Sequence, residues 1–137
     1  MAANNSPIFV LTPKVGGIGV NITAANTAKD GTGTVNNIYT AGANGAYIVK
    51  IKCKPLGTNT ATVLRIFLNN GGSNTTATNN SMWKEITLPA ITLTELASLS
   101  DFEYMINEPI DPTFKLNAVL ATAVAAGWHV LAVGGDF

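Results

Sequence analysis

Few side chains in this 137-residue chain are able to carry out a reaction. There is one histidine, His129, and one cysteine, Cys53, and a lone histidine needs a nucleophile or a carboxylate beside it to catalyse. Two carboxylates acting as acid and nucleophile would support glycoside hydrolysis. The second half of the chain holds several candidates for such a pair: Glu95, Asp101, Glu103, Glu108 and Asp111. Because nothing in their spacing selects two of them, we interpret them as a solvated acidic rim.

Two short glycine motifs do not match known ligand loops. The run VGGIG at 15–19 lacks the spacing of a dinucleotide loop and the Lys-Ser/Thr pair of a phosphate loop. The run DGTG at 30–33 has no second copy, which an aspartic-protease dyad needs to share a proton. Zinc takes three or four ligands, and Cys53 and His129 lie in different strand-like runs. The sequence therefore predicts no catalytic residue, no cofactor and no metal site.

The composition favours association with other proteins. Hydrophobic residues make up 47% of the chain and charged residues 12%, about half the usual charged share. Eight basic and eight acidic residues cancel, so self-repulsion is weak. The same balance argues against nucleic acid as a partner, since phosphates are bound by a basic surface. The longest weakly polar stretch, 116–133, is interrupted by polar residues, and we expect no membrane span.

Alternation with a period of two is the dominant pattern and predicts β-strands. In the run 46–54, Tyr47, Val49, Ile51 and Cys53 are expected on one face and lysines on the other. The same rule assigns inward residues in five further runs: Leu64, Ile66 and Leu68; Met82, Lys84, Ile86 and Leu88; Phe102, Tyr104 and Ile106; Phe114, Leu116, Ala118 and Leu120; Trp128, Val130 and Ala132. Weaker runs at 8–11, 17–22 and 35–41 bring the total to about eight or nine strands.

Regular spacing of these runs, with turns rich in Asn, Gly and Asp between them, predicts an all-β fold in one domain over residues 1–137. The architecture we expect is a jelly-roll-like antiparallel β-sandwich. Pro7 and Pro13 bracket the first run, which predicts an edge strand or an extended N-terminal arm over residues 1–13. The polar opening at 1–5 predicts no secretion signal, and the single Cys53 allows no internal disulfide.

Two segments have helical features. The sequence Thr92–Glu95 matches the capping-box pattern, which predicts a short helical turn near 93–99. The alanine-rich run 114–126 has good helix formers, so a helix is the rival of a strand there. We prefer a strand because its large residues alternate and Gly127 ends the run.

Aromatic residues are the best candidates for contacts with other chains. Phe67 and Trp83 fall opposite the inward residues of their strands, which places both on an outer sheet face unless one face assignment is inverted. Together with Ile8 and Phe9 of the arm, they are the predicted protein-contact residues. The lysines at 50, 52 and 54 share one face, where they either attract an acidic partner or, as we prefer, block unwanted pairing at a sheet edge.

Three segments resemble small structural proteins of tailed bacteriophages. They are TVLRIFLNNG at 62–71, WKEITLPA at 83–90 and AGWHVLAVGGDF at 126–137. The resemblance covers about residues 47–137, and the proteins are the jelly-roll cement, or decoration, proteins on the outside of icosahedral heads. It implies a jelly roll without catalytic residues, made in the host cytoplasm and located on the outer capsid surface of the virion. It also implies two partners: the major capsid protein, and copies of the same chain in a dimer or trimer.

We therefore expect a non-enzymatic virion protein that binds the capsid and stabilises the head. Binding to the assembled lattice but not to free subunits would give that stabilisation by mass action. The alternative is a jelly-roll module of a phage tail or fibre that binds carbohydrate or a receptor, with an exposed Trp or Tyr stacked on a sugar. An enzyme ranks third because no group of residues meets the requirements of an active site.

Overall fold

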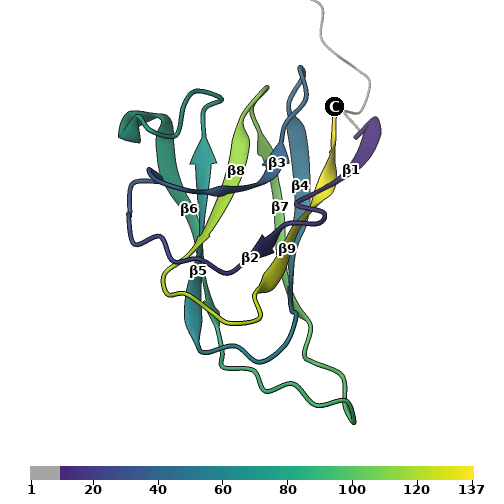
Figure 1. The fold of residues 1–137 in the computed structure, drawn as a ribbon. Helices are drawn as coiled ribbons and strands as arrows, with labels where there is room; N and C mark the ends of the chain where they lie inside the picture. The colour runs from purple at the N-terminus through teal and green to yellow at the C-terminus, as the bar shows by residue number, and fades with distance from the viewer. Residues whose placement is uncertain (1–9) are drawn as a thin grey trace, which may run out of the picture.

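The computed structural model describes residues 10–137, which form two antiparallel β-sheets packed face to face (Figure 1). Sheet A contains, in spatial order, β1 (Thr12–Gly16), β9 (Trp128–Asp136), β4 (Ala46–Pro55) and β7 (Phe102–Ile110), and β2 (Asn21–Ile22) also pairs with β9. Sheet B contains β3 (Asn36–Thr40), β8 (Lys115–Leu120), β5 (Thr62–Asn69) and β6 (Asn80–Leu88). A short 3-10 helix, η1 (Ala77–Asn79), precedes β6. The expected all-β sandwich is confirmed.

The order of the strands is that of a jelly roll. From β3 to β5 the chain alternates between the two sheets, β5 and β6 are neighbours in sheet B, and the alternation resumes from β7 to β9. The result is two four-stranded orders, β1-β9-β4-β7 and β3-β8-β5-β6, in which late strands lie between early ones. All strand pairs are antiparallel. Two sheets with this nested connection are the jelly-roll architecture.

The core lies between the sheets and consists of the alternating residues of each strand. Ile51 and Cys53 come from β4, while Leu64 and Ile66 come from β5, and all are 2% exposed or less. Trp128 of β9 is fully buried and meets Phe102 of β7 edge to face at 5.6 Å. The inward assignments were confirmed in β5, β7, β8 and β9, where the predicted residues are buried or pack against the core.

A β-bulge in β4 overturns part of the predicted alternation. Its pairing with both neighbours slips between Ile48 and Lys50. Val49 is the extra residue against β9, whereas against β7 the extra residue lies in β7, between Met105 and Glu108. Because a bulge shifts the side-chain period by one, Ala46 and Ile48 face the core before it, and Ile51 faces the core after it. The expectation that Tyr47 and Val49 point inward is therefore wrong.

The structure also bears on three further expectations: the N-terminal arm, the helical turn near 93–99 and the strand at 114–126. Thr12 and Pro13 pair with β9, and the Leu11 N–H donates to the Asp136 carbonyl, so this end of the predicted arm is part of sheet A. Pro13 does lie in an edge strand of the described residues, as predicted. No helix forms within 93–99, where the chain makes only a turn. The preferred strand at 114–126 is confirmed as β8, which ends at Leu120.

Burial determines the chemistry of the single thiol. Cys53 is 2% exposed, and removal from water raises its pKa to about 12. Because the thiolate is the reactive form, we expect iodoacetamide at pH 8 to leave Cys53 unmodified in the folded protein and to alkylate it fully in denaturant. Mass spectrometry measures both states. Alkylation of the native protein at the rate of a free cysteine would contradict the burial of β4 described above.

Candidate functional site

Phe67 is not exposed, as a residue that contacts another chain would have to be. As predicted, it lies outside the main core cluster, on β5, but its side chain is only 1% exposed. The connection 23–35 crosses over this side of sheet B in Figure 1, and it is attached there by the Asn26 N–H to the Leu120 carbonyl and by the Asn80 side chain to the Asp30 carbonyl. The chain therefore covers its own Phe67, and the prediction that it is an exposed contact residue is wrong.

Trp83 is displaced by a second bulge. In the pairing of β5 with β6, Ile66 faces Lys84 and Phe67 faces Met82, which leaves Trp83 as the extra residue. Its side chain is half-buried and packs against the core, because the bulge turns it to the same side of sheet B as Ile86 and Leu88. Met82, which was expected to point inward, is 41% exposed instead. It lines a cavity of about 180 Å³ between the edge strands β6 and β7. The outward assignment of Trp83 is therefore wrong, and the inverted assignment is correct.

The other two predicted contact residues, Ile8 and Phe9, lie outside the described residues. Just after them, apolar side chains are exposed on and beside the edge strand β1. Val15 in the strand is 41% exposed, Leu11 just before the strand is 77% exposed, and Ile18, in the turn that follows, is 74% exposed. The structure thus shows an apolar strip along this edge of sheet A that the sequence analysis did not single out.

The most exposed apolar side chain of the described residues lies on a projecting loop. The connection 89–101 joins β6 to β7 and extends away from both sheets at the bottom of Figure 1. Leu96 is 96% exposed and Leu93 is 45% exposed. Single exposed leucines are common on protein surfaces, whereas exposed apolar side chains that lie together mark contact surfaces, and this loop exposes two leucines three residues apart. We call residues 89–101 the projecting loop.

The base of the projecting loop is held by several hydrogen bonds. Ile91 and Asn59 exchange both backbone N–H···O bonds, at 2.9 and 3.0 Å, and the Leu93 N–H donates to the Thr58 hydroxyl at 3.0 Å. On the other side, the Lys54 ammonium donates to the Leu99 carbonyl at 2.6 Å. A fixed base reduces the entropy that the loop loses when a partner binds it. At the tip, the Thr94 hydroxyl accepts the Leu96 N–H at 3.2 Å, which favours a turn over the predicted helix.

The three lysines of β4 face carboxylates of β7 and of the end of the projecting loop just before it. Lys50 and Lys52 both approach Glu103, and Lys54 lies 2.7 Å from Asp101. Since β4 is an interior strand of sheet A, its lysines do not protect a sheet edge, and the preferred edge-blocking role is wrong. The lysines are instead partly neutralised in pairs on the outer face of the sheet. Their outward orientation is confirmed.

The pairing of Lys54 with Asp101 makes the loop base sensitive to acid. The hydrogen bond and charge of Lys54 lower the pKa of Asp101 below its ordinary value of 3.8. A lowered folded-state pKa contributes stability that is present above the ordinary pKa and is lost as pH falls through the folded value. We expect NMR titration of the Asp101 carboxyl carbon to give a midpoint below 3.8, and Lys54→Met to raise it. Lys52→Met, which removes a weaker influence, should raise it less, and equal effects would contradict this assignment.

The reactive side chains of the described residues form no metal-binding group. Among residues 10–137 no three His, Cys, Asp or Glu side chains gather as a metal site would require. His129 lies on β9 opposite Lys54 and lines a cavity of about 190 Å³ with Asp101 and Glu103. In the described part of the chain, no helix has the length and apolar character needed to cross a membrane.

Two features of this region escaped the sequence analysis. The capping-box interpretation of 93–99 as a helical turn hides the exposure of Leu96. Leu93, Leu96 and Leu99 have the spacing of an apolar helix face, so no local pattern shows that nothing covers Leu96. Asn59 was not singled out, although it is 3% exposed and connects three loops. No local pattern distinguishes it from the other asparagines of this chain.

The fold and these surfaces define the chain as a β-sandwich of jelly-roll topology with exposed apolar positions at one loop and one edge. Comparison with known proteins adds no relative: no family model, no curated protein and no solved structure matches.

Proposed function

We propose that this chain is a non-enzymatic structural protein of a tailed-bacteriophage virion, which binds the outer surface of the capsid and stabilises the head. The exposure of Leu96 at the tip of a loop with a fixed base carries the proposal. A fully exposed leucine gains about 1.5–3 kcal/mol when it is buried against another protein. The resemblance of the strand segments to cement proteins points to the major capsid protein as that partner.

The distribution of charge is consistent with binding to a protein surface. Eight basic and eight acidic residues leave no net charge to repel a neighbouring copy. On sheet A the lysines of β4 are already paired with carboxylates. The outer face of this sheet therefore presents no large patch of positive charge that would repel a basic surface of another protein. The proposal includes self-association as a dimer or trimer through the edge strand β1, where Val15 is exposed together with Leu11 just before the strand and Ile18 just after it.

Purified particles test this function directly. We expect mass spectrometry to find the chain in virions, and we expect heads that lack it to release DNA at a lower temperature than decorated heads. Adding the purified protein to heads that lack it should restore the higher temperature, since stabilisation follows binding to the assembled lattice. Absence of the chain from purified virions, together with equal head stability with and without it, would refute the proposal.

A further inference from the structure

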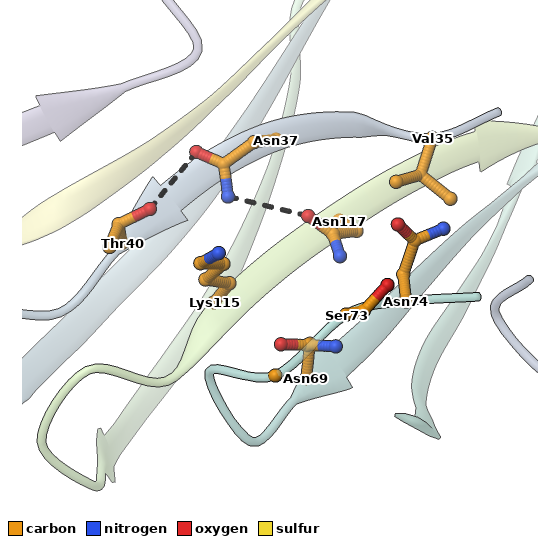
Figure 2. Close-up of a pocket in the computed structure, with 9 residues that line it drawn as sticks. Val35, Asn37, Thr40, Asn69, Ser73, Asn74, Lys115 and Asn117 are labelled. Carbon is orange, nitrogen blue, oxygen red and sulfur yellow. Dashed lines mark hydrogen bonds between the residues drawn. The ribbon is translucent and has the colours of Figure 1, made fainter. Parts of the chain in front are cut away.

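A polar cavity of about 440 Å³ lies on the outer face of sheet B, away from the projecting loop (Figure 2). Strand register explains why polar residues meet there. Asn37 of β3 pairs with Asn117 of β8, and Asn69 of β5 pairs with Lys115 of β8. Residues 115 and 117 point to the same face because side chains alternate along a strand. Three adjacent strands therefore present amides and one ammonium to a common space.

The wall of the cavity is the loop 70–79, which is fixed by several hydrogen bonds. The Asn70 N–H donates to the Asn79 carbonyl at 3.0 Å, and the Asn74 side chain donates to the Gly33 carbonyl at 2.8 Å. The Asn74 contact orients the amide, and Figure 2 shows its oxygen on the side toward β8. A cavity with a rigid wall binds a ligand without the cost of ordering the loop.

One buried amide is only half used by the protein. Asn117 is 4% exposed, and its side-chain oxygen accepts a hydrogen bond from Asn37 at 3.3 Å. Its side-chain nitrogen has no hydrogen-bond partner among residues 10–137 and points into the cavity in Figure 2. The nitrogen is open to the cavity and can donate to a ligand or to water, since among the described residues Trp128 Nε1 is the only buried side-chain polar atom without a partner. Lys115 likewise forms no ion pair within this part of the chain, so a donor and a cation face the same space.

The hydrogen-bonding groups of the cavity select its ligand class. Amide donors and acceptors match neighbouring hydroxyls, each of which donates and accepts, and Lys115 matches a carboxylate. Phosphate fits poorly, because the Gly71 and Gly72 N–H groups are already bonded to the side chains of Asn69 and Asn70. A peptide also fits poorly, since Val35 is the one aliphatic side chain in the lining and peptide recognition uses apolar pockets.

We propose that this cavity binds an acidic sugar, such as a uronic acid residue of a polysaccharide. The Asn117 nitrogen and the Asn74 oxygen contact its hydroxyls, and Lys115 contacts its carboxylate. Without an aromatic side chain in the lining, a single sugar binds weakly, with a dissociation constant of about 1 mM. The site goes beyond the proposed function and does not depend on it, because it uses a different face of the protein.

NMR titration of the purified protein with glucuronic acid tests the site. We expect shifts of the Asn117 side-chain NH₂ signals and of loop 70–79, with glucose binding about tenfold more weakly. Lys115→Met should remove the preference for glucuronic acid over glucose, and Asn117→Asp should weaken glucuronic acid binding at least tenfold. Lys52→Met, which removes a cation from the outer face of sheet A, is the matched control and should change neither.

Lys115 is partly exposed, so Lys115→Met should leave the fold intact. This variant therefore tests the site even if Asn117→Asp impairs folding. Two results would overturn the proposal. One is the absence of shifts at about 50 mM glucuronic acid, far above the expected dissociation constant. The other is equal binding of sodium acetate, which would show that the cavity binds a carboxylate and not a sugar. Either result leaves the particle experiments unaffected.

Discussion

Replacing Leu96 by aspartate is expected to weaken binding to undecorated capsids by about 100-fold, or about 3 kcal/mol. The side chain is 96% exposed, so in the isolated protein the change removes no packing. In the complex proposed here, it replaces a buried leucine with a carboxylate that must lose its water. Cosedimentation of purified protein with capsids measures the dissociation constant, and thermal unfolding of the free protein should shift little.

Met105→Asp is the control that separates the loop from the rest of the surface. Met105 is 62% exposed on β7, so its replacement adds the same charge at another apolar surface position. We expect this variant to bind capsids nearly as well as the unchanged protein. Undiminished binding by Leu96→Asp would exclude the projecting loop as the contact. Equal losses in both variants would instead attribute the effect to added negative charge.

Replacing Asn59 by alanine is expected to lower the free energy of unfolding by about 3 kcal/mol. The side-chain oxygen accepts the N–H groups of Ala126 and Gly127, each at 2.9 Å, and the nitrogen donates to the Gly127 carbonyl at 2.9 Å. Alanine leaves the buried Gly127 N–H and the partly buried Ala126 N–H without a partner, and an orphaned buried group costs about 1–3 kcal/mol. The Gly127 carbonyl keeps a second donor, the Leu56 N–H. Denaturant unfolding measures the loss.

Asn70→Ala is the matched control for this stability prediction. Asn70 also uses its side chain for two hydrogen bonds, to the Gly72 N–H and to Asn79, but it is exposed. Water replaces the lost partners there, so we expect a loss below about 1 kcal/mol. Similar losses in the two variants would show that burial of Asn59 does not determine its contribution.

The local pattern of the sequence was sufficient for the strands and most of their faces. In β7, β8 and β9 the predicted inward residues recur at every second position, and Phe102, Leu116 and Trp128 all contact the core as expected. Period-two alternation encodes a strand with one buried side whatever the strand pairs with. The jelly-roll order of the strands also agrees with the expected architecture.

Pairing between distant strands decided the assignments that failed. The bulges at Val49 and Trp83 arise where β4 and β6 fit the register of their neighbours, and each reverses the faces predicted from alternation alone. Phe67 followed the predicted face, yet the connection 23–35 covers it. None of these partners is near in sequence, so no local pattern contains them.

Composition and alternation by themselves determined that this chain is a neutral, all-β sandwich with Asn- and Gly-rich connections. The tertiary structure alone decided which surface is exposed and which polar groups meet. Leu96 protrudes, Asn59 is buried, and Asn117 shares a cavity with Lys115 because strands and loops far apart in sequence come together. Side-chain periodicity depends on a residue's neighbours in the chain, whereas burial and cavity geometry depend on neighbours in space.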